Sequence, residues 1–301
     1  MNKRLEEIGQ KRSLFIIEVL LIVLTMILMQ CSVLINSVNA ETATGSDGDV
    51  SWSFDSETGV LTFSGSGEIS KKWMESINKD NVKNVVIKDG ITRIGEDAFQ
   101  LCYQLIEIQI PNSVSQIGRN AFIYCNKLEK IELGNIEKIE PQTFQNCENL
   151  KSIIIPNSVN TISDNAFSHC KNLESVTIEE GVKNIGGYAF VDCKKLKNIK
   201  IPKSIEYIHP VAFSGCNELE SIEVEDSNQQ YTSENGLLYS KDMTELIYYP
   251  EGKKEKLYVV PESVTKIKNG QDIFENGNIN LNKIVVPNNV TNIEKWRFSN
   301  E

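Results

Sequence analysis

The sequence predicts a repeat solenoid, mainly β, built from short parallel strands. Three observations support this fold class: a phenylalanine recurs every 22 or 23 residues, a cysteine follows each phenylalanine after three residues, and a leucine follows each cysteine after three more. A near-constant period of this length is typical of solenoids. The phenylalanines are Phe99, Phe122, Phe144, Phe167, Phe190 and Phe213, the cysteines are Cys102, Cys125, Cys147, Cys170, Cys193 and Cys216, and the leucines are Leu105, Leu128, Leu150, Leu173, Leu196 and Leu219.

Residues 1–40 predict export. Four basic residues lie within the first twelve, an apolar run follows from Val19 to Met29, and small residues up to Ala40 suit a signal peptidase. We expect a signal peptide cleaved after Ala40. An uncleaved anchor is a second reading, although Glu18 disfavours a stable span. Lipidation of Cys31 is a third, although Gln30 stands where a lipobox has Gly, Ala or Ser.

Composition and charge favour a folded, acidic protein. The chain is 40% hydrophobic and 24% charged, as in ordinary folded proteins. Its formal net charge is −10, and it becomes −11 without the four basic and three acidic residues of residues 1–40. An acidic surface repels phosphate backbones, so we expect no nucleic acid partner.

Two strands are expected in each repeat of the regular array, residues 83–225. After each leucine, two apolar residues flank a third residue, and this period of two predicts a strand with one buried face. A second apolar pair follows, for instance Val114 with Ile117, so the chain turns and returns. The first pairs are Ile108 and Ile110, Ile131 and Leu133, Ile153 and Ile155, Val176 and Ile178, Ile199 and Ile201, and Ile222 and Val224.

Stacking of these coils is expected to form the core. One coil of about 23 residues cannot bury its own apolar face, but coils stacked at the strand spacing of about 4.8 Å align like side chains into internal ladders. We therefore expect Phe and Cys ladders inside. Loops or short 3₁₀ turns should surround each Ala-Phe-x-x-Cys segment.

The repeated unit, Leu-x-x-Ile-x-Ile-Pro-x-x-Val-x-x-Ile-x-x-x-Ala-Phe-x-x-Cys, is similar to the BspA-like leucine-rich-repeat family of bacterial surface proteins. The resemblance implies a right-handed leucine-rich-repeat solenoid. Within residues 41–82, expected to form an N-terminal linker and β cap, Trp52–Phe54 and Gly59–Gly65 resemble the family's capping β-hairpin. Residues 226–260 resemble its irregular hairpin insertion.

Residues 261–301 are expected to form final, incomplete repeats. The register resumes with Val264, Ile267 and Phe274, and again at Phe298. An uncapped last coil would leave apolar rungs open to water, so self-association through the C-terminal end is a further expectation.

The cysteines are expected to be buried free thiols. Six of the seven share one repeat position, and parallel stacking holds their Cβ atoms about 4.8 Å apart, whereas a disulfide needs about 3.8 Å. Spacings of 22 and 23 residues also give no Cys-x-x-Cys pair, so we expect no metal site.

Catalytic residues are not expected. The chain has two histidines, His169 and His209, and both occupy repeat positions that other residue types fill in other coils. Phosphate loops, nucleophile elbows and His-Glu-x-x-His motifs are absent from the sequence. We therefore predict no enzyme activity and no cofactor.

The strand alternation predicts a candidate ligand-binding face, formed by the residues that point away from the core. These residues form two columns: Glu107 and Gln109, Lys130 and Glu132, Ser152 and Ile154, Ser175 and Thr177, Asn198 and Lys200, and Ser221 and Glu223. Five tyrosines in or beside the insertion, Tyr231, Tyr239, Tyr248, Tyr249 and Tyr258, suggest a second surface, or simply the interior of a half-buried hairpin.

Two functions fit this reading. The first is a secreted or cell-surface adhesion protein, and the family resemblance implies host matrix proteins, other cells or glycans as ligands of the repeat surface. Contact with a membrane would then come only from an uncleaved N-terminal segment. The second is an architectural spacer or self-associating stalk. The ligand cannot be identified from the residues.

Overall fold

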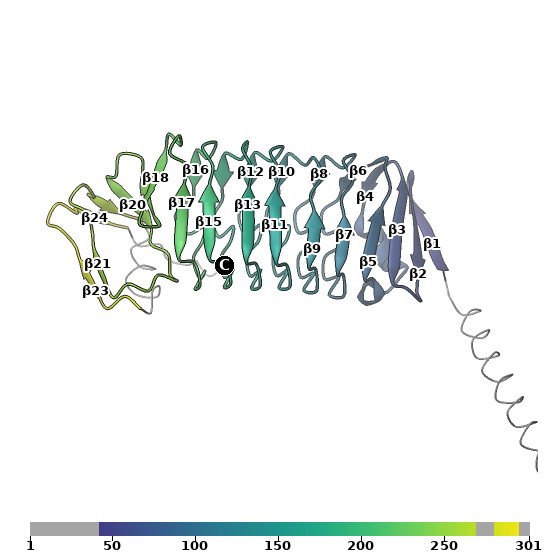
Figure 1. Ribbon diagram of the computed structural model, residues 1–301. Helices are drawn as coiled ribbons and strands as arrows, with labels where there is room; N and C mark the ends of the chain where they lie inside the picture. The colour runs from purple at the N-terminus through teal and green to yellow at the C-terminus, as the bar shows by residue number, and fades with distance from the viewer. Residues whose placement is uncertain (1–41, 269–279, 295–301) are drawn as a thin grey trace, which may run out of the picture.

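The structure is a computed structural model that describes residues 42–268 and 280–294. The expectations about residues 1–40, Phe274 and Phe298 lie outside these residues. The described chain is a mainly β solenoid of stacked coils with short parallel strands, as predicted, and Figure 1 shows the coils side by side along one axis.

Each regular coil contributes one strand to each of two rows. The first row comprises β5 (Asn84–Ile87), β7 (Glu107–Gln109), β9 (Lys130–Glu132), β11 (Ser152–Ile155), β13 (Ser175–Ile178), β15 (Asn198–Ile201) and β17 (Ser221–Val224). The second comprises β4 (Gly67–Ile69), β6 (Ile91–Ile94), β8 (Gln116–Ile117), β10 (Lys138–Ile139), β12 (Thr161–Ile162), β14 (Asn184–Ile185) and β16 (Tyr207–Ile208), paired as one seven-stranded parallel sheet. Like positions pair: Ile162 faces Ile185, and Ile185 faces Ile208.

A three-stranded antiparallel cap closes the N-terminal end. It consists of β1 (Thr42–Asp47), β2 (Val50–Asp55) and β3 (Val60–Gly65), and β3 pairs in parallel with β5. The sequence predicted the β2–β3 hairpin but not β1, which has few apolar residues. Gly45 of β1 lies under the Trp52 ring, where a Cβ would come 2.3 Å from a ring carbon, so only glycine fits there.

Two short 3₁₀ helices, η1 (Lys71–Glu75) and η2 (Lys79–Asn81), follow the cap. Trp73 of η1 is buried, its indole N–H donates to the Ala98 carbonyl at 2.9 Å, and its ring lies 5.8 Å from Phe99. Trp73 therefore packs against Phe99, the first phenylalanine of the core stack. Around the Ala-Phe-x-x-Cys segments the described chain has hydrogen-bonded turns instead of 3₁₀ helix.

The six repeat phenylalanines form a continuous stack in the core. Their ring centroids are 5.2–5.7 Å apart and neighbouring rings are within 13° of parallel. All six side chains are almost fully buried. Offset stacking of this kind adds to the free energy gained by burying apolar area, so each ring stabilises the coils on both sides.

The repeat cysteines lie beside this stack and bind neighbouring coils together. Each thiol from Cys125 onward donates to the carbonyl of the phenylalanine one coil earlier, at 3.1–3.3 Å between sulfur and oxygen. The Phe122 carbonyl, for example, accepts both the Cys125 N–H and the Cys147 thiol. Cysteine is therefore suited to this position because it is small and apolar yet still donates one weak hydrogen bond.

Two backbone positions in each turn adopt the left-handed conformation. The residue before Ala (before Thr143 in the coil that lacks this Ala) and the residue before Cys have φ between 56° and 61° in five successive coils: Asp97, Asn120, Gln142, Asn165 and Tyr188, and Leu101, Tyr124, Asn146, His169 and Asp192. Most of these N–H groups donate to the next coil, as Leu101 does to the Ile123 carbonyl at 2.8 Å. The left-handed conformation costs free energy, and the hydrogen bonds between coils that it permits compensate for this cost.

The insertion contains three antiparallel strands, β18 (Tyr231–Glu234), β19 (Leu237–Ser240) and β20 (Glu245–Tyr248). The next coils follow with β21 (Leu257–Val259), β22 (Lys266–Ile267), β23 (Lys283–Val285) and β24 (Asn292–Ile293). β21 pairs with β23, and β20, β22 and β24 form a second parallel series. The two coils rest on a separate core that includes Leu246, Val264 and Ile267.

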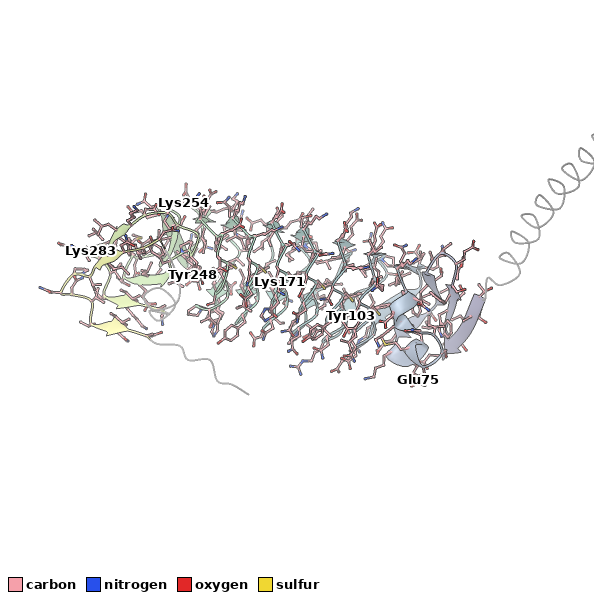
Figure 2. The ribbon with its side chains drawn as sticks, turned by 90° about the horizontal axis from the view of Figure 1, so that it is seen from below. Glu75, Tyr103, Lys171, Tyr248, Lys254 and Lys283 are labelled. Atoms are coloured by element: carbon pink, nitrogen blue, oxygen red, sulfur yellow. The ribbon has the colours of Figure 1, made fainter. Side chains whose placement is uncertain are left out.

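Side chains of the insertion replace the hydrogen bonds of the coil that it displaces. The Tyr248 hydroxyl donates to the Phe213 carbonyl at 2.7 Å, where a repeat cysteine would donate, and its ring packs edge-on against Phe213. A carboxylate oxygen of buried Glu251 accepts the Gly215 N–H at 2.7 Å. The insertion therefore covers the last coil of the regular array. Figure 2 labels Tyr248 in this part of the stack.

Removal of one ring tests the stack. Phe144→Ala should lower the free energy of unfolding by about 3–5 kcal/mol, because it leaves a cavity between two close-packed rings. The measurement is denaturant unfolding followed by circular dichroism. Tyr103→Ala is the control, because Tyr103 is 41% exposed and should cost less than about 1 kcal/mol. Equal losses for the two variants would contradict the stacked core.

Glycine at a strained turn position should raise the free energy of unfolding instead of lowering it. Gln142→Gly should raise the free energy of unfolding by roughly 0.5 kcal/mol, because relief of the φ of 60° outweighs the extra freedom of glycine in the unfolded chain. Gln145→Gly, in the same turn but without positive φ, should lower it by about 0.5–1 kcal/mol. Paired thermal melts measure both, and a loss of stability in both variants would refute the assignment.

Candidate binding surface

The predicted face lies on the outer side of the first strand row. Eleven of its twelve residues are exposed, and the strand register sets them in columns: Glu107 beside Lys130, and Gln109 beside Glu132. The pairs Ser152 and Ser175, Ile154 and Thr177, Asn198 and Ser221, and Lys200 and Glu223 are likewise adjacent. Ser221 is half-buried, because the β18–β19 turn lies over it and the Gly236 carbonyl accepts the Ile222 N–H.

The charges on this face are largely paired. The Lys130 ammonium lies 2.9 Å from a Glu132 carboxylate oxygen, and this hydrogen bond lowers the pKa of Glu132 and raises that of Lys130. The Lys200 ammonium lies 2.7 Å from Glu225, which likewise raises the pKa of Lys200. Lys130, Glu132 and Lys200 are solvent-exposed and Glu225 is half-buried at the surface, so the pairs add little stability. Their effect is a face with alternating charge and no strong field of one sign.

Apolar residues interrupt the polar columns. Ile154, at 59% exposure, stands in the middle of the face. One column extends beyond the predicted residues, because Val86 lies beside Gln109. Leu257, Val259 and Val285 are also exposed, on the β21–β23 pair that follows the insertion. The alternation of Val85 and Ile87 with Val86 could have shown the first extension. The last three were missed because the insertion hides the register.

An open hollow of about 500 Å³ lies where three strands of this face end. Val86, Gln109 and Glu132 line one side, and the turn residues Asp89 and Asn112 line the other. Carboxylate and carboxamide groups at successive coils make this a polar recess of the predicted face. It provides hydrogen-bonding groups, and its charged lining residues are the two carboxylates Asp89 and Glu132.

The tyrosine surface expected at the insertion is wrong, and the other reading, a half-buried hairpin, holds. Tyr231, Tyr239, Tyr248 and Tyr249 are 8% exposed or less. The Tyr231 and Tyr239 hydroxyls bond internally: the Tyr231 oxygen accepts the Ile208 N–H at 2.9 Å, and the Tyr239 and Tyr258 oxygens are 2.8 Å apart. These rings fill the junction between the array and the last two coils.

The six repeat thiols are buried and unpaired to other sulfurs. Burial raises the pKa of Cys102 to about 12 and the pKa values of Cys125, Cys147, Cys170 and Cys193 further. A thiolate is the reactive form, so these groups are poor nucleophiles and poor metal ligands at neutral pH.

The two histidines belong to different coils. His169 Nδ1 lies 3.2 Å from an Asp192 carboxylate oxygen at the turn surface. Burial lowers the pKa of His209. Residues 42–268 and 280–294 hold no cluster of His, Cys, Asp or Glu suited to a metal ion. In the same residues, no helix has the length and apolar character to cross a bilayer.

Comparison with known proteins agrees with the geometry. The model of the BspA type leucine rich repeat region matches residues 74–197, 137–255 and 162–301, in six copies. A leucine-rich repeat protein from Eubacterium ventriosum is 26% identical with a TM-score of 0.56, over 85% of this chain and 62% of that one. This chain thus spans less than two thirds of that relative's length. No curated protein matches.

Two further solved structures share the fold. A leucine rich cell surface protein from Faecalibacterium prausnitzii is 23% identical with a TM-score of 0.60, over 84% of this chain and 76% of that one. The pneumococcal vaccine antigen PcpA is 21% identical with a TM-score of 0.58, over 84% of this chain and 69% of that one. At these identities the likeness concerns the fold alone.

Thiol reactivity tests the burial of the cysteines. At pH 8, iodoacetamide should leave the six repeat cysteines unmodified in the folded protein and modify all six in guanidinium chloride, as peptide mass spectrometry would report. Because the folded-state pKa is raised, stability should hold below the ordinary thiol pKa of about 8.5 and fall as the pH rises above it. Rapid labelling of any repeat cysteine in the folded protein would contradict the ladder.

Proposed function

Because the chain belongs to the BspA type leucine rich repeat family, we propose that it is a non-catalytic, secreted or cell-surface adhesion protein that binds a protein or glycan ligand through the exposed columns. One observation carries this proposal. The inward positions of every coil are committed to stacking, whereas the outward positions of the first row vary between charged, polar and apolar residues without any structural need.

The rigidity of the face supports a role in binding. Its side chains stand on strands whose backbone is fixed by the neighbouring coils, so little conformational entropy is lost when a ligand orders them. The ion pairs of Lys130 and Lys200 orient a ligand, while the face as a whole does not strongly attract ligands of one charge. Ile154 offers a central apolar contact of the kind that anchors a ligand.

The absence of catalysis is part of the same proposal. The thiols are protonated and enclosed, and the two histidines lie apart on turns of different coils. Of the solved structures that share the fold, one is called a leucine rich cell surface protein and one a vaccine antigen. Display outside the cell also agrees with the export expected from residues 1–40.

A second candidate, a self-associating stalk, has one observation in its favour. Three of the four outward residues on β21 and β23 are apolar: Leu257 is 52%, Val259 is 57% and Val285 is 40% exposed, and the fourth is Lys283. Contiguous apolar exposure often marks a contact with another protein. A second copy could cover this part of the face.

Paired variants separate the two candidates. Thr177→Ala with Lys200→Ala should weaken saturable binding to cells, matrix proteins or glycan arrays at least about tenfold, since central interface contacts dominate affinity. The matched control is Thr161→Ala with Lys183→Ala on the second row, where Lys183 is also ion-paired, to Glu206 at 3.1 Å.

The control should bind as the unmodified protein does, and both variants should unfold at the same denaturant concentration. Binding that is equally strong in both variants would refute the face. Concentration-dependent association that Val259→Lys abolishes, without any ligand on the arrays, would favour the stalk.

A further inference from the structure

The second strand row is interrupted once, between β16 and the insertion. The seven-stranded sheet ends at β16, and the parallel series resumes with β20 and β22. An open hollow of about 430 Å³ lies at this junction. Its lining combines apolar and polar groups: Tyr207, Ile208, Pro210, Gln230, Tyr231, Ser240, Glu245, Ile247 and Lys268.

Tyr207 at the edge of the hollow is not explained by the fold. Its side chain is 48% exposed, and the same column in earlier coils holds Arg93, Gln116, Lys138, Thr161 and Asn184. Stacking thus requires no aromatic residue at this position. The ring lies edge-on to His209, with centroids 6.4 Å apart, which holds it in place beside the recess.

The floor of the hollow excludes an added strand. A β16 edge would normally offer backbone groups to an extended peptide. Here the Ile208 N–H already donates to the Tyr231 hydroxyl at 2.9 Å. Buried Ile247 completes an apolar floor next to it. The recess is therefore closed to strand addition and open to a compact ligand.

The polar rim carries no excess charge. Lys266 and Lys268 both lie near Glu294, at 3.0 Å and 3.1 Å, and near Glu245, at 3.4 Å and 3.9 Å. Two cations and two carboxylates thus balance one another. The Gln230 amide and the Ser240 hydroxyl add neutral hydrogen-bonding groups. A neutral ligand with many hydroxyls fits this rim better than a phosphate or a carboxylate does.

We propose that this hollow binds a neutral sugar ring, with the apolar face of the sugar against Tyr207 and its hydroxyls toward Gln230, Ser240, Glu245 and Lys268. The inference rests on the proposed binding function and names a ligand class and a second site for it. An aromatic ring with one exposed face and a polar rim is the combination that recognises a ring having both C–H and O–H surfaces.

The test is a titration of the full chain with neutral hexoses and N-acetylhexosamines, followed by nuclear magnetic resonance of the sugar. We expect saturable, millimolar binding of at least one sugar. Tyr207→Asn, which copies Asn184 of the preceding coil, should weaken it about tenfold, whereas Tyr207→Phe should retain it within about twofold. Tyr124→Asn is the control, since Tyr124 is equally an exposed tyrosine, at 41%, but lies on a turn.

The outcomes separate this inference from the proposed function. Sugar binding lost in Tyr207→Asn alone supports the hollow. Sugar binding unchanged in Tyr207→Asn, or preference for an extended valine-threonine peptide over every sugar, overturns it. If the array ligand still depends on Thr177 and Lys200 while no sugar binds, the hollow is refuted and the face stands; if neither binds, both fail.

Discussion

The structure depends on one constraint: a coil of this length cannot bury its own apolar side chains, so each coil needs a neighbour on both sides. The phenylalanine carbonyl shows how closely the coils are tied, because it accepts the N–H of a cysteine in its own turn and the thiol of a cysteine in the next coil. Side chains, backbone and thiols therefore share one spacing. The one 22-residue repeat, between Phe122 and Phe144, keeps this spacing, since its two rings stack at 5.4 Å and the Cys147 thiol still reaches the Phe122 carbonyl.

This constraint explains which features the sequence could predict. The Phe, Cys and strand positions repeat because stacking demands like beside like, so the fold class and the outward columns follow from spacing alone. The strained turn positions do not show in the sequence, because residues as different as Leu101, Tyr124 and His169 share one φ, and the hydrogen bond to the next coil compensates each. β1 escaped prediction because a cap strand needs pairing more than apolar side chains.

The sequence left two interpretations of the insertion open for a related reason. Interface tyrosines and capping tyrosines have the same composition, and only the contacts distinguish them. Where the next coil is missing, side chains make its hydrogen bonds. The Tyr231 hydroxyl and the Glu251 carboxylate accept backbone N–H groups, as carbonyls of the next coil would, and the Tyr248 hydroxyl donates as a repeat thiol would. Side chains can do this because a long polar group reaches across the distance of one coil. The repeat period does not reveal these replaced hydrogen bonds, since each replacement occurs once in the chain.

The dependence of each coil on its neighbours also affects where a ligand can bind on such a protein. In a regular stack every coil repeats the curvature of the last one, so binding to the displayed face depends on its side chains and on the open recess where β5, β7 and β9 end. A break in the stack creates concave shape without loss of stability, provided that the exposed edge is satisfied from within. At β16 the Tyr231 hydroxyl meets this condition. The residues around the break are then released from the repeat, and Tyr207 stands where every earlier coil has a non-aromatic side chain. Regular coils thus give the molecule its length, its displayed face and the polar recess where β5, β7 and β9 end, while the interruption gives it a recess with an exposed aromatic residue at its edge.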